Sequence, residues 1–352
     1  MEVEMYYRHF TFVIGLAISV LLTQTPAAAQ AQRAKANNTT AKQDWTPPRT
    51  VEGQPDLQGV WANNNATPLE RPKDLAGRAF LTDQEVAALK QKAGELFGGD
   101  GDAAFGDGVF EAVLASVKQS KAGPHKKAAD EFDAGTGDYS SVWTVARDWD
   151  NRTSLIINPA DGRLPPMTPE GQKRRDAAAA ARNRPAAGPE DRSLSERCIT
   201  FGSPRLGAGY NSYFQIVQSA KQVAILMETI HDVRVIPLDG STHLPSNVQT
   251  WLGDPRGRWE GDTLVVDTTN YLPGVFMNVS TEKLHVVEKF TRASPETLNW
   301  EITIDDPGAW SKPWIAMIPL RHSKDALYEY SCHEDNYGLY DILAGARAEE
   351  NR

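Results

Sequence analysis

Apolar and polar residues alternate in short runs along the second half of the chain. Runs of this kind, bounded by Gly, Pro, Asn or Asp, are typical of β-strands with one buried face. They cover residues 210–218, 222–230, 232–238, 262–271, 284–292, 297–305, 314–322 and 326–332. The mostly short loops between them predict an antiparallel meander, which protects its edges by closing into a barrel or folding into a sandwich. We therefore predict a mainly β fold, an antiparallel β-barrel with peripheral α-helices.

Strand and helix patterns also occur before these runs. Residues 55–63 predict a first short strand. Residues 81–97 predict a helix, because Thr82 at its start is followed three residues later by Glu85, the pattern of a capping box. Residues 110–118 predict a further short helix within a stretch that is otherwise rich in Gly, Asp, Ala and Lys.

Two more helices are predicted from capping and spacing. One follows a strand at Thr153–Ile157 and has Thr168 as its N-cap and Pro169 at its first position. The other covers residues 336–350 at the end of the chain. Its ring-bearing and apolar residues recur at helical spacing, so we expect them to pack on the barrel: Tyr337, Tyr340 and Leu343.

The amino terminus has the pattern of a secretory signal. An apolar run from Phe10 to Leu22 follows Arg8 and precedes the small residues Ala27 and Ala29. The run is shorter than the ~20 residues that a membrane-spanning helix needs, so we predict cleavage after Ala29. The alternative is an uncleaved anchor. After cleavage we expect a periplasmic or secreted chain that no longer contacts the membrane.

One compact domain is expected behind this signal. Residues 1–29 are predicted to be the signal peptide, and residues 30–50, which are polar and lack periodicity, a flexible leader. Residues 51–197 are predicted to hold N-terminal strands, helices and a mobile insertion. Residues 198–352 are predicted to form the β-rich barrel portion with its C-terminal helix.

Charge and cysteine content narrow the choice of partners and compartment. The net charge of -9 and the lack of a concentrated basic face argue against nucleic acid and anionic membranes as partners. Two cysteines, Cys198 and Cys332, are expected to form a disulfide in an oxidising compartment. The alternative is a pair of isolated thiols, with Cys332 as a nucleophile beside His333. Nine tryptophans are many for this length, so some of them are expected to line a cavity or interface.

Several sequence blocks span almost the whole mature chain and are specific, among them IHDVRVIPLDGSTHLP, GRWEGDTLVVDTTNY and YEYSCHEDNYGLYDILAGARAEE. Together they resemble a widespread family of exported bacterial proteins that are usually labelled hypothetical. The resemblance implies a β-barrel-like exported protein and brings no residue roles. A looser likeness is to lipocalin or calycin barrels, because GVW at residues 59–61 is similar to the Gly-x-Trp that closes one end of those barrels.

Strand alternation identifies charged residues on apolar faces. In residues 284–292 the face of Leu284, Val286 and Phe290 also carries Glu288 and Arg292. One interpretation is an ion pair between Glu288 and Arg292 at the barrel end. The other is a polar group that orients a ligand inside an apolar cavity.

The same reasoning applies to two neighbouring runs. Asp267 shares a strand face with Val265, and the sequence does not decide which face is buried. Trp314 and Leu320 align with His322, a histidine at the end of an apolar face. Such a histidine is more often a core or rim residue than a catalyst, and the alternation gives it no partner.

The segment around His231 concentrates ionisable residues. His231 has the parity of Val233 and Val235, whereas Asp232 and Arg234 have the opposite one, so His231 is expected to face apolar neighbours unless a bulge shifts the register. A turn then brings His243 back toward this strand.

A histidine with a carboxylate partner suffices for acid/base catalysis, and the candidate pairs are His231 or His243 with Asp232, Asp239 or Glu260. The alternative is that these aspartates cap turns while both histidines sit at the rim. The histidine spacing matches no tight metal pattern, so no metal is predicted.

Two loops offer further candidates. Trp259 and Glu260 lie between glycines, which is either a simple hairpin or an aromatic wall with an acid or base at the barrel mouth. His333 and Glu334 follow Cys332 at a predicted strand end, where loops often carry function. A disulfide at Cys332 would hold His333 in place.

These observations lead to one function hypothesis and two alternatives. No nucleophile elbow, phosphate-binding loop, dinucleotide fingerprint or Cys-x-x-Cys motif is present in the sequence. We expect a cofactor-free lyase, isomerase or hydrolase acting on a small apolar or aromatic molecule. The alternatives are a non-catalytic carrier of such a molecule and a structural envelope protein. The candidate catalytic residues are His231, Asp232, Arg234, His243, Glu288 and His333. The candidate ligand-binding residues are Trp259, Glu260, Asp267, Arg292, Trp314 and His322.

Overall fold

The computed structural model describes residues 45–97, 101–102, 108–120, 145–209, 211–334 and 336–350. The chain divides into two compact units, Met1–Thr46 and Pro47–Arg352, and the fold below is that of the second. The predicted signal peptide, most of the predicted leader and most of the predicted insertion lie outside the described residues. Among the residues that are described, no helix combines the length and apolar character needed to cross a bilayer.

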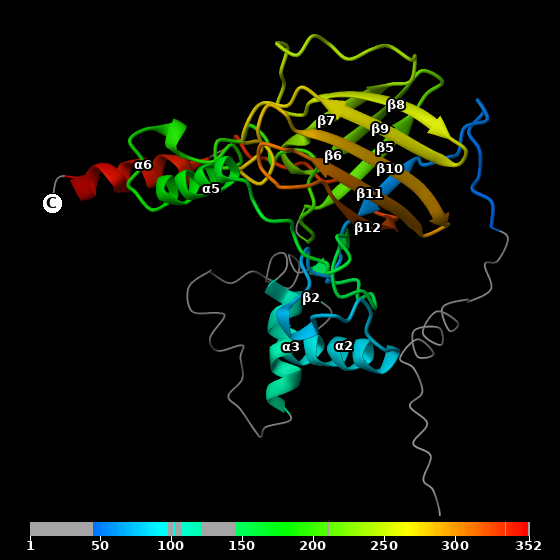
Figure 1. Cartoon of the computed structure of the whole chain (residues 1–352), viewed down its shortest axis with the longest axis horizontal. Helices are drawn as coiled ribbons and strands as arrows, with labels where there is room; N and C mark the ends of the chain where they lie inside the picture. The colour runs from blue at the N-terminus through cyan, green and yellow to red at the C-terminus, as the bar shows by residue number, and fades with distance from the viewer. Residues whose placement is uncertain are drawn as a thin grey trace, which may run out of the picture. The chain divides into compact units, whose positions relative to one another are not determined.

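A ten-stranded antiparallel sheet forms the larger part of this unit (Figure 1). The strand order is β7-β6-β5-β1-β12-β11-β10-β9-β8, and β4 pairs with β12. The strands are β1 (Gly59–Ala62), β4 (Ile156–Asn158), β5 (Tyr213–Gln218), β6 (Gln222–Met227), β7 (Val233–Pro237), β8 (Asp254–Glu260), β9 (Thr263–Thr269), β10 (His285–Ser294), β11 (Thr297–Asp305) and β12 (Trp314–Ser323). The prediction of a mainly β, antiparallel fold is confirmed.

Strand β1 joins two meanders, β5 to β7 and β8 to β12. It pairs with β5 on one side and with β12 on the other, so that Trp61 lies opposite both Phe214 and His322. The predicted strand at residues 326–332 is wrong, because these residues form no strand. Both edges of the preceding strand, β12, are already occupied by β1 and β11, which leaves no free ladder beside it. Strand β8 was not among the predicted runs.

The sheet is not closed by hydrogen bonds. Its order ends at β7 and β8, and no ladder joins these two strands in the described part of the chain. The two edges nevertheless approach each other at Gly257 on β8, where a Cβ atom would lie 2.7 Å from Ile236 and 2.6 Å from Leu238. We call this contact between β7 and β8 the seam. The predicted closed barrel is therefore not confirmed.

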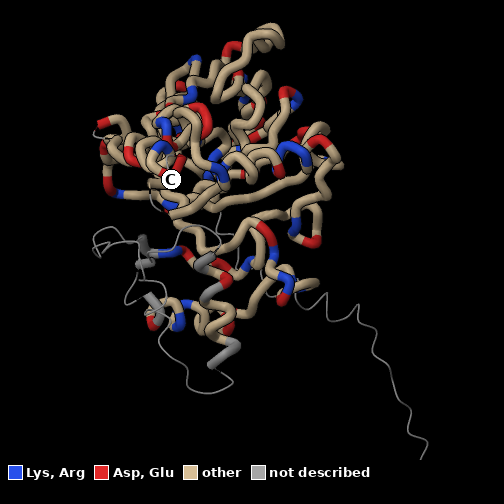
Figure 2. The backbone as a smooth tube through the Cα atoms, turned by 90° about the vertical axis from the view of Figure 1, so that its left-hand side faces the viewer, with Lys and Arg blue, Asp and Glu red and all other residues tan. Residues whose placement is uncertain are grey.

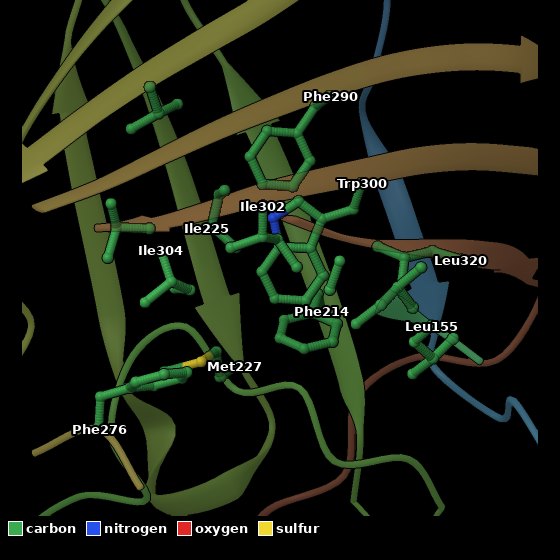
Figure 3. Packing of buried hydrophobic residues seen from close by; sticks show 14 of the residues in the cluster. Leu155, Phe214, Ile225, Met227, Phe276, Phe290, Trp300, Ile302, Ile304 and Leu320 are labelled. Carbon is green, nitrogen blue, oxygen red and sulfur yellow. The ribbon is translucent and has the colours of Figure 1, made fainter. Parts of the chain in front are cut away.

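The interior of the sheet is filled by large side chains from alternating positions. Val286, Glu288 and Phe290 on β10 are buried, whereas Arg292 on the same face is half-buried. The predicted inward residues of β12 from Trp314 to Leu320 are also buried. Figure 3 shows Phe214, Phe290 and Trp300 packed together between the strands. The ring of Trp300 stacks on Phe290 with centroids 5.8 Å apart and meets Phe214 edge-on at 5.6 Å. Alternation thus identified the buried face of these strands correctly.

The helices lie outside the sheet and have their own caps. They are α2 (Asp83–Phe97), α3 (Gly108–Ser120), α5 (Pro169–Arg182) and α6 (Tyr337–Glu350), with a small sheet of β2 (Gly101–Asp102) and β3 (Val145–Ala146). The capping box of α2 is confirmed, since the Glu85 amide donates to Thr82 Oγ1 and the Thr82 amide donates to Glu85 Oε2. Thr168 caps α5 as predicted, by accepting from the Gly171 amide. A separate apolar cluster joins α2 and α3: Leu75, Leu81, Leu89, Phe110 and Val113.

Helix α6 is present, but its predicted packing face is wrong. Tyr337 and Tyr340 are 65% and 69% exposed, so they do not pack on the sheet. Arg347 holds the helix elsewhere, donating to the carbonyl oxygens of Ala186 and Ala187 at 2.7 and 3.0 Å. The helix therefore docks through a polar anchor, which aromatic spacing does not reveal.

Candidate functional site

A fully buried ion pair crosses the interior between β7 and β10. Arg234 Nη1 donates to Glu288 Oε1 at 2.9 Å, and Arg234 Nη2 donates to Glu288 Oε2. Trp300 Nε1 also donates to Glu288 Oε1 at 3.1 Å, and Thr268 Oγ1 lies 3.4 Å from Arg234 Nη2. Burial alone would lower the pKa of Arg234, but the charge and hydrogen bonds of Glu288 together raise it. Arg234 therefore remains charged, and Glu288 lies against it as its counter-charge.

This pair corrects two expectations from the sequence. The partner of Glu288 is Arg234, not Arg292. The inward face of β7 carries Arg234 and Ile236, which are buried, whereas Val233 and Val235 are 47% and 48% exposed. The expectation that the valine face is buried was wrong because the guanidinium finds a buried counter-charge across the interior, which makes its burial tolerable.

The interior contains a cavity of about 10 Å³, roughly the space for one water molecule. Its lining is mostly apolar, with two guanidinium groups and a hydroxyl among the apolar residues. The lining residues are Ser203, Pro204, Arg205, Phe214, Ile216, Ile225, Met227, Arg234, Phe290, Trp300 and Leu320. Of the predicted candidates only Arg234 lines it, and Trp314 does not. The interior is thus more tightly filled than the sequence led us to expect.

A group of ionisable side chains adjoins this cavity, and we call Arg205, Glu228, His231 and Asp232 the mouth cluster. Glu228 directly follows the cavity residue at the end of β6 and is only 5% exposed. Asn211 Nδ2 donates to its carboxylate at 2.6 Å. Burial raises the pKa of Glu228, although the Asn211 hydrogen bond and the charge of Arg205 oppose the shift.

The other carboxyl and the arginine of the mouth cluster are perturbed in the same way. Thr200 Oγ1 donates to Asp232 at 2.6 Å, yet burial raises the pKa of Asp232 overall. Burial lowers the pKa of Arg205 to about 10, despite the nearby charge of Glu228. Arg205 Nη1 donates to Thr229 Oγ1, which places the guanidinium at the turn that carries Glu228. Shifts toward neutral forms at several adjoining groups are typical of functional sites.

The backbone at the mouth cluster is strained. Ile230 and His231 have φ angles of +60° and +62°, a left-handed conformation that β-branched residues rarely adopt. Such strain persists only where the surroundings impose it, and it is frequent at functional sites. His231 is exposed and accepts a hydrogen bond on Nε2 from the Tyr330 amide at 3.3 Å. The prediction that His231 groups with Val233 and Val235 is correct, but all three side chains are exposed to solvent.

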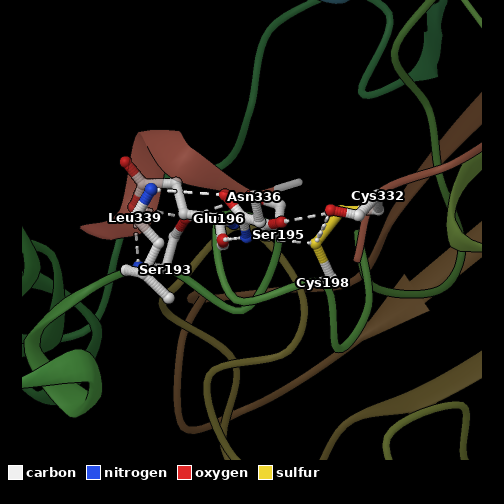
Figure 4. The surroundings of a disulfide bond; sticks show 7 residues. All are labelled: Ser193, Ser195, Glu196, Cys198, Cys332, Asn336 and Leu339. Atoms are coloured by element: carbon white, nitrogen blue, oxygen red, sulfur yellow. Dashed lines mark hydrogen bonds between the residues drawn. A yellow bond between two sulfur atoms is a disulfide. The ribbon is translucent and has the colours of Figure 1, made fainter. Parts of the chain in front are cut away.

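The predicted disulfide is confirmed, and it lies beside the mouth cluster. Cys198 and Cys332 are joined with their Cα atoms 5.7 Å apart (Figure 4). Thr200, two residues from one cysteine, binds Asp232, and Tyr330, two residues from the other, binds His231. The disulfide thus ties together two segments that contact the cluster. His333 follows Cys332 with an exposed side chain.

A second polar arrangement forms on β8, β9 and β10, and it contains His243. Its Nδ1 lies 3.2 Å from Asp254 Oδ2, and its Nε2 lies 3.0 Å from Asp267 Oδ1. His285 Nε2 also lies 3.0 Å from Asp267 Oδ1, and Arg256 donates to Asp254 at 2.6 Å. His243 and Asp267 were predicted candidates, but not as partners. We call these five residues the histidine cluster.

The remaining candidates lie apart from both clusters. Glu260 is exposed and pairs with Arg258 at 2.7 Å, beside the two-residue turn between β8 and β9. The hairpin interpretation therefore describes this turn. Trp259 is partly buried against the core.

Arg292, His322 and Trp314 serve packing. The guanidinium carbon of Arg292 lies 5.4 Å from the centroid of the Trp61 ring, and His322 meets Trp61 edge-on at 5.3 Å. Trp314 is fully buried against Trp310, with ring centroids 5.8 Å apart.

Neither cluster has the geometry of a metal site: in the described residues no three His, Cys, Asp or Glu side chains are placed to hold an ion. Figure 2 shows basic and acidic residues interspersed along the described backbone.

A scan against protein-family models finds no match to the chain, and a search of curated proteins finds no relative. The function must therefore be argued from the geometry alone.

Several site residues were missed by the sequence analysis. Glu228 lies within a predicted strand run and was not among the candidates, and Arg205 lies in an irregular segment without a pattern. Asp254 and His285 are the first residues of β8 and β10, and the sheet register brings them to either side of Asp267 on β9. Asp254 contacts His243, and His285 contacts Asp267. The one local signal was the density of ionisable residues in positions 228–243, which does indicate the regions of both clusters.

Proposed function

We propose that this chain is an exported, cofactor-free enzyme that performs acid/base chemistry on a small apolar or aromatic molecule at the mouth cluster. The observation that carries the proposal is Glu228, a buried carboxyl group whose pKa is raised next to the charged Arg205 at the cavity. A carboxyl that keeps its proton nearer to neutral pH serves as a general acid or base. The disulfide supports export, since such bonds persist in oxidising compartments.

Each residue of the mouth cluster has a role in this proposal. Glu228 transfers the proton, and Arg205 stabilises negative charge that develops on the substrate. Asp232 is the second carboxyl with a raised pKa, and its hydrogen bond to Thr200 fixes its orientation. His231 is held by the Tyr330 amide with Nε2 as the acceptor. Its other ring nitrogen is then the one that carries hydrogen.

Substrate entry requires movement at the cavity edge, because a cavity of about 10 Å³ holds no organic molecule. Met227 and Arg205 are two of the long, unbranched side chains in the lining, and both can adopt other rotamers. We propose that the strands enclose the substrate in a barrel-like interior whose seam is closed by side-chain packing.

A carrier is the second candidate, and a different observation favours it. Arg234 Nε and Ser203 Oγ are buried in the cavity lining without a hydrogen-bond partner in the described residues. Such atoms fit a ligand that presents a hydrogen-bond acceptor on an apolar body. Binding of this kind needs no proton transfer.

Mass spectrometry of small molecules that copurify with the protein, followed by their incubation with wild type and Glu228→Gln, tests the proposal. We expect wild type to convert the bound molecule and the variant to be at least about 100-fold slower. Glu301→Gln is the control, because Glu301 pairs with Lys289 at 3.3 Å on the outer surface. A bound molecule that wild type leaves unchanged would favour the carrier. Absence of any bound molecule would favour a structural role.

A further inference from the structure

Residues 238–253, which we call the strap, connect β7 and β8, the two strands at the open edges of the sheet. The strap contains no helix or strand and exposes Leu244, Val248 and Trp251. The seam beneath it has no hydrogen-bonded ladder. Main-chain hydrogen bonds hold its two ends, from the Leu238 amide to the Lys221 carbonyl and between Thr250 and residues 270 and 272. The part between these ends is held by side-chain contacts.

His243 is central among these contacts. It comes from the strap and touches two carboxylates, Asp254 at the start of β8 and Asp267 on β9. Four neighbouring hydrogen bonds hold the same part of the strap. The Leu244 amide donates to Asp254 at 2.8 Å, and Arg256 Nε donates to the Thr242 carbonyl at 3.1 Å. Asn270 Nδ2 donates to the carbonyl oxygens of Leu244 and Pro245 at 3.0 and 3.3 Å.

Both contacts of His243 are hydrogen bonds only when both ring nitrogens carry hydrogen, because carboxylates only accept. A neutral imidazole has one N–H, so it must face one carboxylate with a bare nitrogen. Histidine ordinarily changes between these forms in the range of about pH 5 to 8.

Two carboxylates and one guanidinium surround His243. Asp254 and Asp267 contribute two negative charges, and Arg256 contributes one positive charge. Protonation of His243 makes this set neutral, whereas a neutral His243 leaves one negative charge without compensation. His285 faces the same Asp267 oxygen and is the other histidine of the cluster.

We propose that His243 is a pH-sensitive latch that fastens the strap across the seam when it is protonated and loosens it when it is neutral. Hydrogen bonds from a charged donor are about twice as strong as neutral ones, and the charge is lost as pH rises. The latch is therefore closed at acidic pH and weakened at alkaline pH. Loosening it frees the connection between β7 and β8, and β7 carries Arg234 in the cavity wall. The latch does not depend on the proposed enzymatic function.

Hydrogen exchange measured by mass spectrometry at pH 5 and pH 8, corrected for the intrinsic exchange rate, tests the latch. In wild type we expect protection of strap peptides to fall about tenfold between pH 5 and pH 8. His243→Gln should show low protection at both pH values. His322→Gln is the matched control, because this partly buried histidine packs on Trp61 away from any strap residue, and it should retain the wild-type pH effect.

Other variants and a second readout keep the test decisive. Asp267→Asn removes one negative charge beside His243 and should reduce the pH effect even if His243→Gln fails to fold. Chymotrypsin cleavage after Trp251 reports strap opening independently, since residues 238–253 contain no Lys or Arg for trypsin. Equal protection of wild type at both pH values would overturn the latch. So would a pH effect that survives in His243→Gln but disappears in His285→Gln.

Discussion

Replacement of Glu288 by glutamine should strongly destabilise the fold. Glu288 is completely buried and provides both acceptors for the Arg234 guanidinium. Glutamine keeps the size of the side chain but removes its charge, which leaves a buried guanidinium that cannot lose its proton. Breaking a buried pair in this way costs about 3 to 5 kcal/mol. Since domains are stable by about 5 to 15 kcal/mol, this loss is a large share of the total.

The double variant Arg234→Met with Glu288→Leu should recover most of this loss. Removal of both charges leaves an apolar interior, and such replacements are often neutral or stabilising. One cost remains, because Trp300 Nε1 loses its acceptor, which is worth about 1 to 3 kcal/mol. The expected loss is therefore about 1 to 3 kcal/mol, smaller than that of Glu288→Gln alone. Compared with the single variants Arg234→Met and Glu288→Leu, the double variant should show a coupling energy of at least about 3 kcal/mol.

Urea unfolding at pH 7 with the disulfide intact measures these differences, and an unchanged denaturant slope would support two-state behaviour. Glu301→Gln provides a control on the neighbouring strand β11. Its pair with Lys289 is exposed, so its loss should cost less than about 1 kcal/mol. If Glu288→Gln were as stable as this control, or if the two single losses simply added in the double variant, the reasoning about buried charge would be refuted.

Three further predictions concern packing, crosslinking and titration. Gly171→Ala should lower the free energy of unfolding in urea by about 1 to 3 kcal/mol, because its Cβ would lie 2.3 Å from a main-chain carbonyl oxygen. Gly345→Ala should raise it by about 0.5 to 1 kcal/mol, because its Cβ would have no neighbour within 4 Å and alanine favours the helix. Replacing Cys198 and Cys332 by serine should cost about 4 to 5 kcal/mol by chain entropy, and a loss below about 1 kcal/mol would contradict that account. Burial raises the pKa of Glu228, so its stabilising contribution is present at acidic pH and is lost as pH rises. Wild type should therefore lose stability relative to Glu228→Gln between about pH 4 and 7, which urea unfolding at each pH measures.

Much of the fold could be predicted because burial decides it locally. On β10 and β12 the inward residues alternate without interruption, and the structure buries the residues that the pattern selected. The capping box at Thr82 and the cap at Thr168 are also local, since each side chain binds an amide three residues away. The disulfide followed from composition, because the chain has only two cysteines.

The sequence could not locate contacts that depend on non-local pairing. Arg234 and Glu288 are 54 positions apart, and the arginine makes its strand appear to bury the opposite face. Alternation assumes that a buried face is apolar, so it fails where two buried charges neutralise each other. The same limit hid Arg205, which reaches Glu228 from a segment without regular structure.

The two polar clusters and the buried pair differ in what their burial permits. Arg234 and Glu288 are buried and pair with each other, so they fix the arrangement of β7 against β10. The histidine cluster is partly exposed, and the number of its hydrogen bonds changes with one proton, which suits a switch. The mouth cluster combines buried carboxyls with an arginine at a cavity, which suits proton transfer. Strand β7 carries the buried Arg234 and directly follows the strained turn of the mouth cluster. A movement of β7 at the seam is therefore expected to displace both the ion pair and the mouth cluster.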